Sequence, residues 1–262
     1  MDTRPIGMFD SGCGGLTVLK EYMNQMPNED FIYYGDTAHL PYGDKSPEKI
    51  IEYSEEIVKF LISKNVKLII IACGTASATA YDYLKSKYNI EIKNIIEPTA
   101  KAIQDKNIGI IATKATVKSG AWEQNILKYN PNAKVTSVAC PLFVPLIEEG
   151  LISNPATDYI IKEYMKPFFY VDSSSNQRLP NVSSLILGCT HYPILKEKLQ
   201  NIIGPEINLV NAGHHSAIDT LNFLKASKIQ NSNEHQGNIQ FFASDDFNAF
   251  KKNAQILNFY ID

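Results

Sequence analysis

Two cysteines in this chain occur in the same kind of local sequence. Cys73 interrupts IIIACGTASA at residues 69–78, and Cys189 interrupts LILGCTHYPIL at residues 185–195. Each pattern predicts a buried strand, then the cysteine and a threonine, then a helix. Only about 3% of a cysteine with an ordinary pKa is thiolate at pH 7, and a helix N-terminus increases that fraction. One such cysteine would be interpreted as core, but two in matching settings indicate reactive thiols.

Other polar side chains follow apolar runs in the same way. In open parallel sheets, functional groups gather just beyond the carboxyl ends of strands. The residues at such places, besides the two cysteines, are Asp10 and Ser11, Thr113 and Thr116, Thr190 and His191, and the Pro41-Tyr42-Gly43 turn that follows GDT at 35–37. Asp10 and His191 are the expected partners for setting the protonation of the two thiols. Cys13 and Cys140 are interpreted as core cysteines.

The sequence gives weak support for nucleotide or metal binding. The glycines of DSGCGG at residues 10–15 match neither G-x-G-x-x-G nor GxxxxGK[ST], so a tight strand-to-helix turn that exposes Asp10 and Ser11 is the better interpretation. No CxxC or Cys/His ligand spacing occurs, so we predict no metal site. The remaining histidines are interpreted as structural or solvent-facing: His39, His214, His215 and His235.

Composition narrows the class of partner. The 262 residues are 44% hydrophobic and 20% charged, with a net charge of -3. Nucleic acids and anionic membranes favour a basic surface, so we expect neither as a partner and predict a small-molecule ligand instead. The N-terminus lacks a signal-peptide pattern, and the longest apolar runs are strand-sized. We therefore expect a cytoplasmic protein with reduced thiols.

The elements that must position these residues alternate along the chain. Short apolar runs predict buried strands at Ile6–Phe9, Phe31–Tyr34, Leu68–Ala72, Ile108–Ala112, Val135–Ala139, Leu185–Leu187, Ile207–Val210 and Ile239–Ala243. Amphipathic stretches between them predict helices, such as the one after Ser46-Pro47 and the one after Ser244-Asp245. This alternation is typical of an α/β protein with mostly parallel strands. The polar segment Ser173–Pro180 predicts an exposed loop.

Two pairs of segments within the chain resemble each other weakly, and this similarity, which we call the internal echo, indicates two related halves. The two cysteine segments resemble each other, and IGMFDSG resembles IGIIATKAT, with each member of the second pair lying upstream of one cysteine. The pattern predicts two α/β halves related by a pseudo-two-fold axis.

In order and spacing, the motifs of this chain resemble those of bacterial glutamate racemases, cofactor-independent members of the aspartate/glutamate racemase family. The segments that carry the resemblance are FDSGCGGLTVLKE, GDTAHLPYG, IACGTASA, CPLFVPLIEEG and LILGCTHYPILK, from Ile6 to about Asp219. The resemblance implies two pseudo-symmetric, doubly wound parallel-sheet domains of flavodoxin-like type, with the active site in the cleft between them. The implied boundaries are residues 1–97 plus 209–262 for the first domain and 98–208 for the second.

The resemblance also implies an activity and a site. The activity is interconversion of L- and D-glutamate without a cofactor, which supplies D-glutamate for peptidoglycan synthesis. In this assignment Cys73 serves the D-enantiomer, Cys189 serves the L-enantiomer, Asp10 and His191 assist them, and Glu148 supports His191. The implied substrate-binding residues are Asp10, Ser11, Tyr42, Gly43, Gly74, Thr75, Thr116, Thr190 and His191. The family often forms dimers, so a homodimer is the implied assembly.

Three alternatives stay open on sequence grounds. A related racemase would act on aspartate or a hydantoin. A hydrolase or amidase would use Cys189 as a nucleophile and His191 as its base. A binding protein would keep the fold without the chemistry, and here Gly74 is relevant because the family's usual sequence is Cys-Asn-Thr. Glu148 also has a plain interpretation as an exposed carboxylate at a helix end, beside Glu149.

Overall fold

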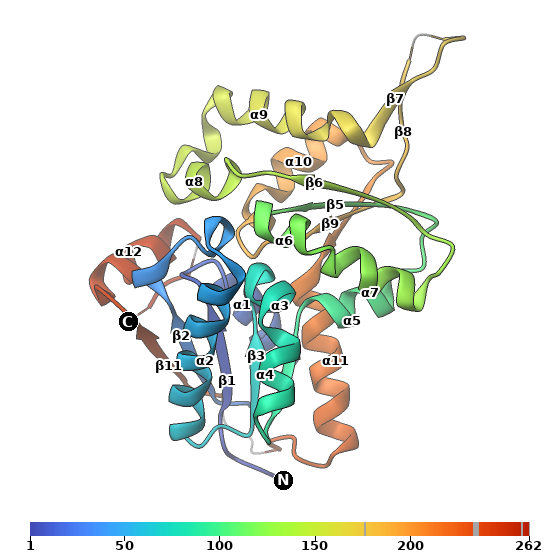
Figure 1. The fold of residues 1–262 in the computed structure, drawn as a ribbon. Coiled ribbons are helices and arrows are strands. Elements are labelled where there is room, and N and C mark those ends of the chain that lie inside the picture. Colours follow the sequence, from blue (N-terminus) through green and yellow to red (C-terminus); the bar gives the residue numbers. More distant parts are fainter. Residues whose placement is uncertain (176, 233–235, 258, 262) are drawn as a thin grey trace.

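The computed structural model describes residues 1–175, 177–232, 236–257 and 259–261, and it contains two α/β halves. Each half has a parallel sheet flanked by helices, and the halves lie one above the other in Figure 1. The five-stranded sheet of the first half has the order β11-β2-β1-β3-β4, and the four-stranded sheet of the second has the order β10-β9-β5-β6. The predicted fold class is confirmed.

The strands agree with the apolar runs of the sequence. Those of the first sheet are β1 (Ile6–Asp10), β2 (Phe31–Gly35), β3 (Leu68–Ile71), β4 (Glu91–Asn94) and β11 (Ile239–Ala243); those of the second are β5 (Asn107–Ala112), β6 (Lys134–Ala139), β9 (Ser184–Leu187) and β10 (Asn208–Asn211). Strand β4 was not predicted from the sequence. Its residues, EIKN, alternate between partly exposed and buried positions at the sheet edge, so it has no continuous apolar run.

The two sheets share one strand order. If the parallel strands of each half are numbered in chain order, both sheets have the strand order 2-1-3-4. The first sheet contains it as β2-β1-β3-β4 and the second as β6-β5-β9-β10. Strand β11 extends the first sheet beyond β2. Strand β1 therefore corresponds to β5, and β3 corresponds to β9, which are the two pairs that the internal echo predicted. The segments that carry Cys73 and Cys189 thus leave equivalent strands.

The two helices predicted after Ser46-Pro47 and after Ser244-Asp245 are both present. The first half contains α1 (Leu16–Gln25), α2 (Pro47–Ser63), α3 (Gly74–Thr79), α4 (Tyr81–Lys87), α11 (Ala212–Ala226) and α12 (Phe247–Ile256), and the second contains α6 (Lys114–Ser119), α7 (Ala121–Tyr129), α8 (Phe143–Glu148), α9 (Pro155–Met165) and α10 (Lys196–Ile203). Helix α5 (Ile96–Ala102) lies at the connection between them and packs on both α7 and α11. Ser46 caps α2, with Pro47 at its first position, and the stripe from Ile50 to Leu61 is buried.

Both faces of the first sheet are covered. On β1, Ile6 and Met8 pack into one apolar cluster with α1 and α11, whereas Phe9 packs into another with α2 and α4. Successive strand side chains point to opposite faces, so burial on both sides requires an uninterrupted apolar run. The first cluster continues into the second half through β5 and β9. This shared core holds the two halves together.

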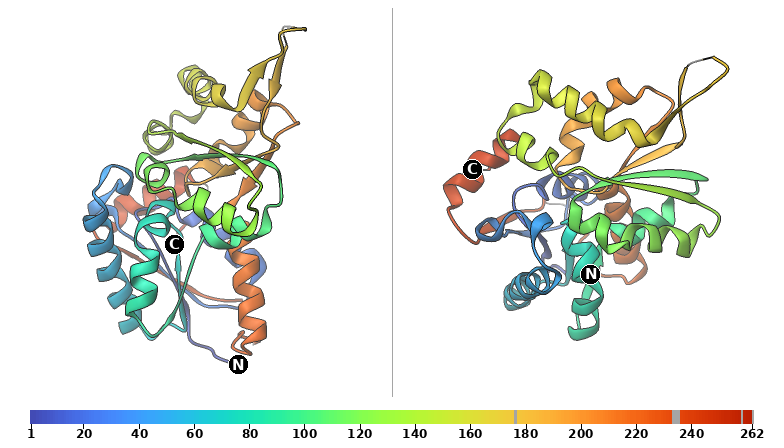
Figure 2. Two further views of the ribbon diagram at one scale, coloured as in Figure 1. Left: turned by 45° about the vertical axis from the view of Figure 1, so that its right-hand side comes forward. Right: turned by 45° about the horizontal axis from the view of Figure 1, so that its top comes forward.

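Two expectations about segment boundaries need correction. Strand β10 pairs with β9, so residues 209–211 belong to the second sheet, although they were predicted to lie in the first domain. We propose that the second domain ends at Asn211 and that the chain returns to the first through α11. Arg178–Pro180, predicted as loop, forms β8 and pairs with β7 (Phe169–Val171) in a hairpin that projects from the second half (Figure 2).

Among the described residues, no helix combines the length and the apolar character that a membrane span requires.

Candidate active site

The two cysteine segments meet where the halves touch. Gly74 follows Cys73, and a Cβ on Gly74 would overlap the carbonyl oxygen of Gly188 and lie 3.7 Å from the Cα of Cys189. Side chains of both cysteines are buried, with 4% of Cys73 and 8% of Cys189 exposed. The structure is therefore a closed state with both thiols enclosed between the halves.

Cys73 lies at the start of α3, as predicted. Its sulfur accepts a hydrogen bond from the backbone N–H of Ala76 at 3.4 Å, and its thiol donates to the Ser11 hydroxyl at 3.6 Å. Burial raises the pKa of the Cys73 thiol to about 12, and the charge of Asp10 acts in the same direction. The helix N–H opposes this rise but does not overcome it. The helix N-terminus thus favours the thiolate, as expected, but burial has the larger effect on the pKa of Cys73 in the closed state.

Cys189 has a different local setting. After Gly188, Cys189 and Thr190, the chain forms a 3-10 turn, η5 (Tyr192–Leu195), before α10 begins. The predicted match of strand, Cys, Thr and helix therefore holds only in part. Instead of a helix N–H, the imidazole of His191 contacts this thiol, with Nδ1 3.9 Å from the Cys189 sulfur.

His191 is buried among acidic groups. Its Nε2 lies 3.0 Å from Oε1 of Glu148, at the end of α8, so the structure brings Glu148 to the site rather than leaving it as a solvent-facing carboxylate. Burial opposes a positive charge on the ring. Hydrogen bonds to two thiols and one carboxyl group outweigh burial and raise the pKa of His191 well above its ordinary value.

Asp10 connects the two halves. It lies at the end of β1, is fully buried, and accepts hydrogen bonds from the Gly12 N–H at 3.0 Å and the Thr190 hydroxyl at 3.2 Å. Burial raises the pKa of its carboxyl group, although the positive charge of His191 opposes this. Thr17, which the sequence analysis did not select, donates to the Thr190 carbonyl at 2.6 Å. These bonds fix Thr190 against the first half.

Three hydroxyl groups meet across the same interface. Thr75 of α3 lies 3.0 Å from Thr113, which caps α6, and Thr113 lies 2.9 Å from Thr116. Thr116 in turn donates to Thr75 at 3.3 Å. The predicted pair Thr75 and Thr116 is therefore brought together, with Thr113 as a third member. Each hydroxyl can also bond to a carboxylate that displaces its neighbour.

The PYG turn closes one side of the site. It forms η2 (Tyr42–Asp44), and a Cβ on Gly43 would lie 2.9 Å from the Cβ of Thr113, so glycine allows this turn to approach the second half. Tyr42 is buried, and its hydroxyl donates to Asp36 at 2.6 Å. The phenol is thus engaged inside the protein, and the backbone of the turn faces the interface.

Asp36 positions this turn. Its carboxylate accepts from the Tyr42 hydroxyl and, at 2.7 Å, from the Ser244 hydroxyl, and it lies 2.9 Å from Nδ1 of His39. We expect Asp36→Asn to raise KM for the substrate about tenfold, since a hydrogen bond to a charged group is worth about 1.5–3 kcal/mol. Steady-state kinetics test this. Ser63→Ala, a surface change far from the turn, is the control, and an unchanged KM in Asp36→Asn would contradict the positioning role.

Cys13 was interpreted as a core residue, and it is buried, but its sulfur also lies within 4.8 Å of a ring nitrogen of His191. Gly14 makes this approach possible, because a Cβ there would overlap the His191 ring. The sequence signal that could have placed Cys13 at the site was its position in DSGCGG, close to Asp10 and Ser11. Asp36, in the GDT turn after β2, was missed in the same way.

The other described histidines make contacts outside the paired-cysteine site. His39 stacks on Tyr53, and His214 lies 3.2 Å from Glu21. His215 packs edge-on against His214. His235 falls outside the described residues. None of the three described histidines contacts the two cysteines through an observed bond.

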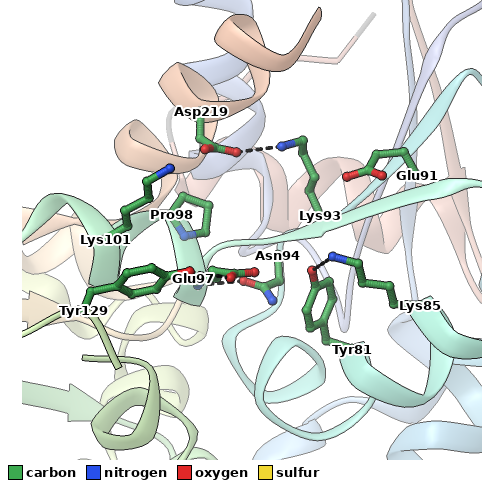
Figure 3. Close-up of a pocket in the computed structure, with 10 residues that line it drawn as sticks. All are labelled: Tyr81, Lys85, Glu91, Lys93, Asn94, Glu97, Pro98, Lys101, Tyr129 and Asp219. Carbon is green, nitrogen blue, oxygen red and sulfur yellow. Dashed lines mark hydrogen bonds and ion pairs between the residues drawn. The ribbon is translucent and has the colours of Figure 1, made fainter. Parts of the chain in front are cut away.

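A separate pocket of about 180 Å³ lies at the connection between the halves (Figure 3). Lys93 forms an ion pair with Asp219 at 2.6 Å, and Lys85 donates to the Tyr81 hydroxyl at 2.8 Å. Its lining residues include no cysteine. The chemistry that the paired thiols can perform therefore belongs to the interface described above and not to this pocket.

These features define a class: a pseudo-symmetric α/β protein with two thiols at equivalent strand ends, enclosed between its halves. The sequence profile of the Asp/Glu/hydantoin racemase family matches residues 16–217, and the chain belongs to this family. The glutamate racemase of Geobacter metallireducens is 41% identical over 249 residues, covering 94% of this chain and 89% of that protein. That of Streptococcus pneumoniae is 42% identical over 217 residues, covering 81% and 78%.

Solved structures agree. The glutamate racemase of Francisella tularensis in complex with D-glutamate superposes with a TM-score of 0.88 at 37% identity, covering 100% of this chain and 96% of that one. The Thermus thermophilus enzyme in complex with β-chloro-D-alanine gives 0.88 at 35% identity with the same coverage. The resemblance to glutamate racemases found in the motifs is confirmed.

Proposed function

We propose that this protein interconverts L- and D-glutamate, with Cys73 and Cys189 as the two acid–base groups. The observation that carries the proposal is that both thiols leave equivalent strands, β3 and β9, and are enclosed together at the contact between the halves. The choice of glutamate as the substrate rests on the glutamate racemases named above, to which this chain is similar. A racemase has to remove a proton from one face of a carbon and return one to the other, which two thiols on related halves can do.

In the direction from D- to L-glutamate, Cys73 removes one proton and Cys189 supplies another. The thiolate of Cys73 takes the α-proton of D-glutamate, and the electron pair of the broken C–H bond spreads into the α-carboxylate. The thiol of Cys189 then delivers its proton to the opposite face, which gives L-glutamate and a Cys189 thiolate. The reverse reaction exchanges the two roles. This proposed step needs neither an oxidant nor a cofactor.

Neighbouring groups have distinct parts in this scheme. We assign Asp10 to assist Cys73 and His191 to assist Cys189, with Glu148 holding the imidazole through its 3.0 Å contact. The hydroxyls of Thr75 and Thr116 face each other across the interface and are suited to the charge that develops on the α-carboxylate. The remaining implied contacts are assigned to Ser11, Tyr42, Gly43, Gly74 and Thr190. Exclusion of water strengthens each of these interactions.

The biological role follows from the activity. A cytoplasmic enzyme that supplies D-glutamate for peptidoglycan synthesis is the role that the family resemblance implies. That role, the location and the homodimer stay predictions.

Solvent-deuterium uptake tests the function directly. Purified protein, treated with chelator and free of pyridoxal phosphate, is incubated in D₂O with L-glutamate, D-glutamate or aspartate. We expect deuterium at the α-carbon and loss of optical activity with both glutamate enantiomers. Preference for aspartate would reassign the substrate within the family. Absence of exchange with every amino acid would overturn the proposal.

The raised pKa of Cys73 sets the expected pH dependence. Burial favours the neutral thiol of Cys73. At any pH below the pKa, each rise of one pH unit therefore increases the fraction of thiolate by up to about tenfold. We expect kcat/KM for D-glutamate to rise from neutral to mildly alkaline pH and to fall again once the partner thiol loses its proton. Initial rates of D-glutamate racemisation across this range measure the profile. A flat profile would contradict a thiolate base at Cys73.

A further inference from the structure

Three side chains with metal-binding groups meet beside Cys189. A ligand atom of Cys13, one of Glu148 and one of His191 all lie within 4.8 Å of one another. Cys13 belongs to the turn after β1, Glu148 ends α8, and His191 follows β9, so the cluster joins both halves. Cys13 and His191 are buried, and 21% of the Glu148 side chain is exposed, which leaves the cluster reachable from the surface.

The donor set suits one kind of ion. A thiolate, an imidazole nitrogen and a carboxylate oxygen are the three ligand types of protein zinc sites, and three protein ligands leave a fourth position open. The thiolate of Cys13 and the carboxylate of Glu148 together balance the charge of a divalent ion, so the buried complex carries no net charge. A thiolate ligand selects Zn²⁺ or Co²⁺ over Mg²⁺ and Ca²⁺.

We propose that Cys13, Glu148 and His191 form a Zn²⁺-binding site, and that the bound ion inhibits the enzyme. Binding breaks the S–H bond of Cys13, forms a zinc–sulfur bond, and releases that proton to solvent together with any proton on the coordinating nitrogen of His191. The ion thereby engages the imidazole of His191, whose Nδ1 lies 3.9 Å from the sulfur of Cys189, together with the Glu148 carboxylate that holds this imidazole. Metal binding needs no racemase activity, whereas the inhibition rests on the proposed function.

Cobalt supplies a spectroscopic test of binding. The full-length protein, freed of metal, is titrated with Co²⁺, and we expect a thiolate-to-cobalt charge-transfer band in the near ultraviolet that saturates at one ion per chain. Zn²⁺ should displace the cobalt, and Mg²⁺ should not. Cys13→Ser and Cys13→Ala should lose the band and weaken Zn²⁺ binding by more than about 100-fold, since even outer-shell partners of metal ligands are worth 10- to 100-fold.

Cys140→Ala is the matched control, because Cys140 is a fully buried thiol outside the cluster. It should keep the band and the Zn²⁺ affinity. No band in the wild-type protein, or an equal band in both Cys13 variants, would overturn the proposed site. Thermal melting of each variant confirms that it is folded.

Inhibition is measured separately. Zn²⁺ should inhibit racemisation by the wild-type protein and the Cys140 variant, with full recovery on chelation, whereas the Cys13 variants should resist relative to their own metal-free rates. Equal sensitivity in all of them would overturn the inhibition. A protein with the cobalt band but without racemisation would contradict the proposed function and leave the site standing, and an active racemase without the band would do the reverse.

Discussion

Replacing either Cys73 or Cys189 by alanine is expected to reduce racemisation of both glutamate enantiomers by about 10²–10⁴-fold, the usual contribution of a positioned acid–base group. Both losses should be large because each direction uses one thiol as base and the other as acid. Polarimetry or circular dichroism of the substrate gives the rates. The folded state should survive, since each change only removes a small side chain at a strand end.

Serine variants separate the two thiols. In Cys189→Ser, Cys73 can still remove the proton of D-glutamate, so exchange of its α-hydrogen with solvent should persist longer than net racemisation; Cys73→Ser should show the same for L-glutamate. Cys140→Ala is the control with unchanged turnover. Near-wild-type turnover in both directions after loss of either thiol would contradict the two-base mechanism. Loss of activity in the Cys189 variant alone, together with a trapped acyl-enzyme, would favour the hydrolase alternative.

Introducing a side chain at Gly74 is expected to reduce kcat about 100-fold, because displacement of reacting groups by 1 Å can cost that much. A Cβ there overlaps the Gly188 carbonyl, which is backbone and cannot rotate away. Both Gly74→Ala and Gly74→Asn should therefore hold the two cysteine segments apart. Steady-state kinetics with each enantiomer measure the loss, and the asparagine variant tests whether the family's usual residue can be restored.

Gly204→Ala is the matched control for the position. Its Cβ meets nothing within 4 Å, yet φ is +82°, so alanine costs stability without touching the site. A Gly204 variant that melts earlier but keeps its kcat would show that stability loss alone does not explain the Gly74 effect. An asparagine at Gly74 that raises activity would show that the closed contact with Gly188 is not the productive one.

The glycine at position 74 allows a close contact within the protein. From sequence, Gly74 is a departure from the family's usual Cys-Asn-Thr, and an asparagine there would offer hydrogen bonds that glycine cannot. The structure shows instead that the absence of a side chain allows α3 to pack on the segment before Cys189. Sequence alone does not show this contact, because the two segments are more than 100 residues apart.

Local sequence determined the elements and the order of the chemistry-bearing residues. Apolar runs such as Leu68–Ala72 can be buried on both faces only as inner strands. The polar residues that directly follow these runs must lie at the carboxyl ends of the strands. The internal echo determined that β1 and β3 have counterparts in β5 and β9. Strand β4 was missed because a half-exposed edge strand carries a weaker pattern.

Tertiary structure decided the electrostatics and the contacts between the halves. A helix N-terminus lowers the pKa of an adjacent thiol, but Cys73 is buried in the folded chain, and desolvation is the larger effect. The placement of Cys13 against His191, of Asp36 against Tyr42, and of Glu148 in the site likewise depends on segments distant in sequence. Burial and long-range hydrogen bonds arise from packing, which periodicity and local propensity do not encode.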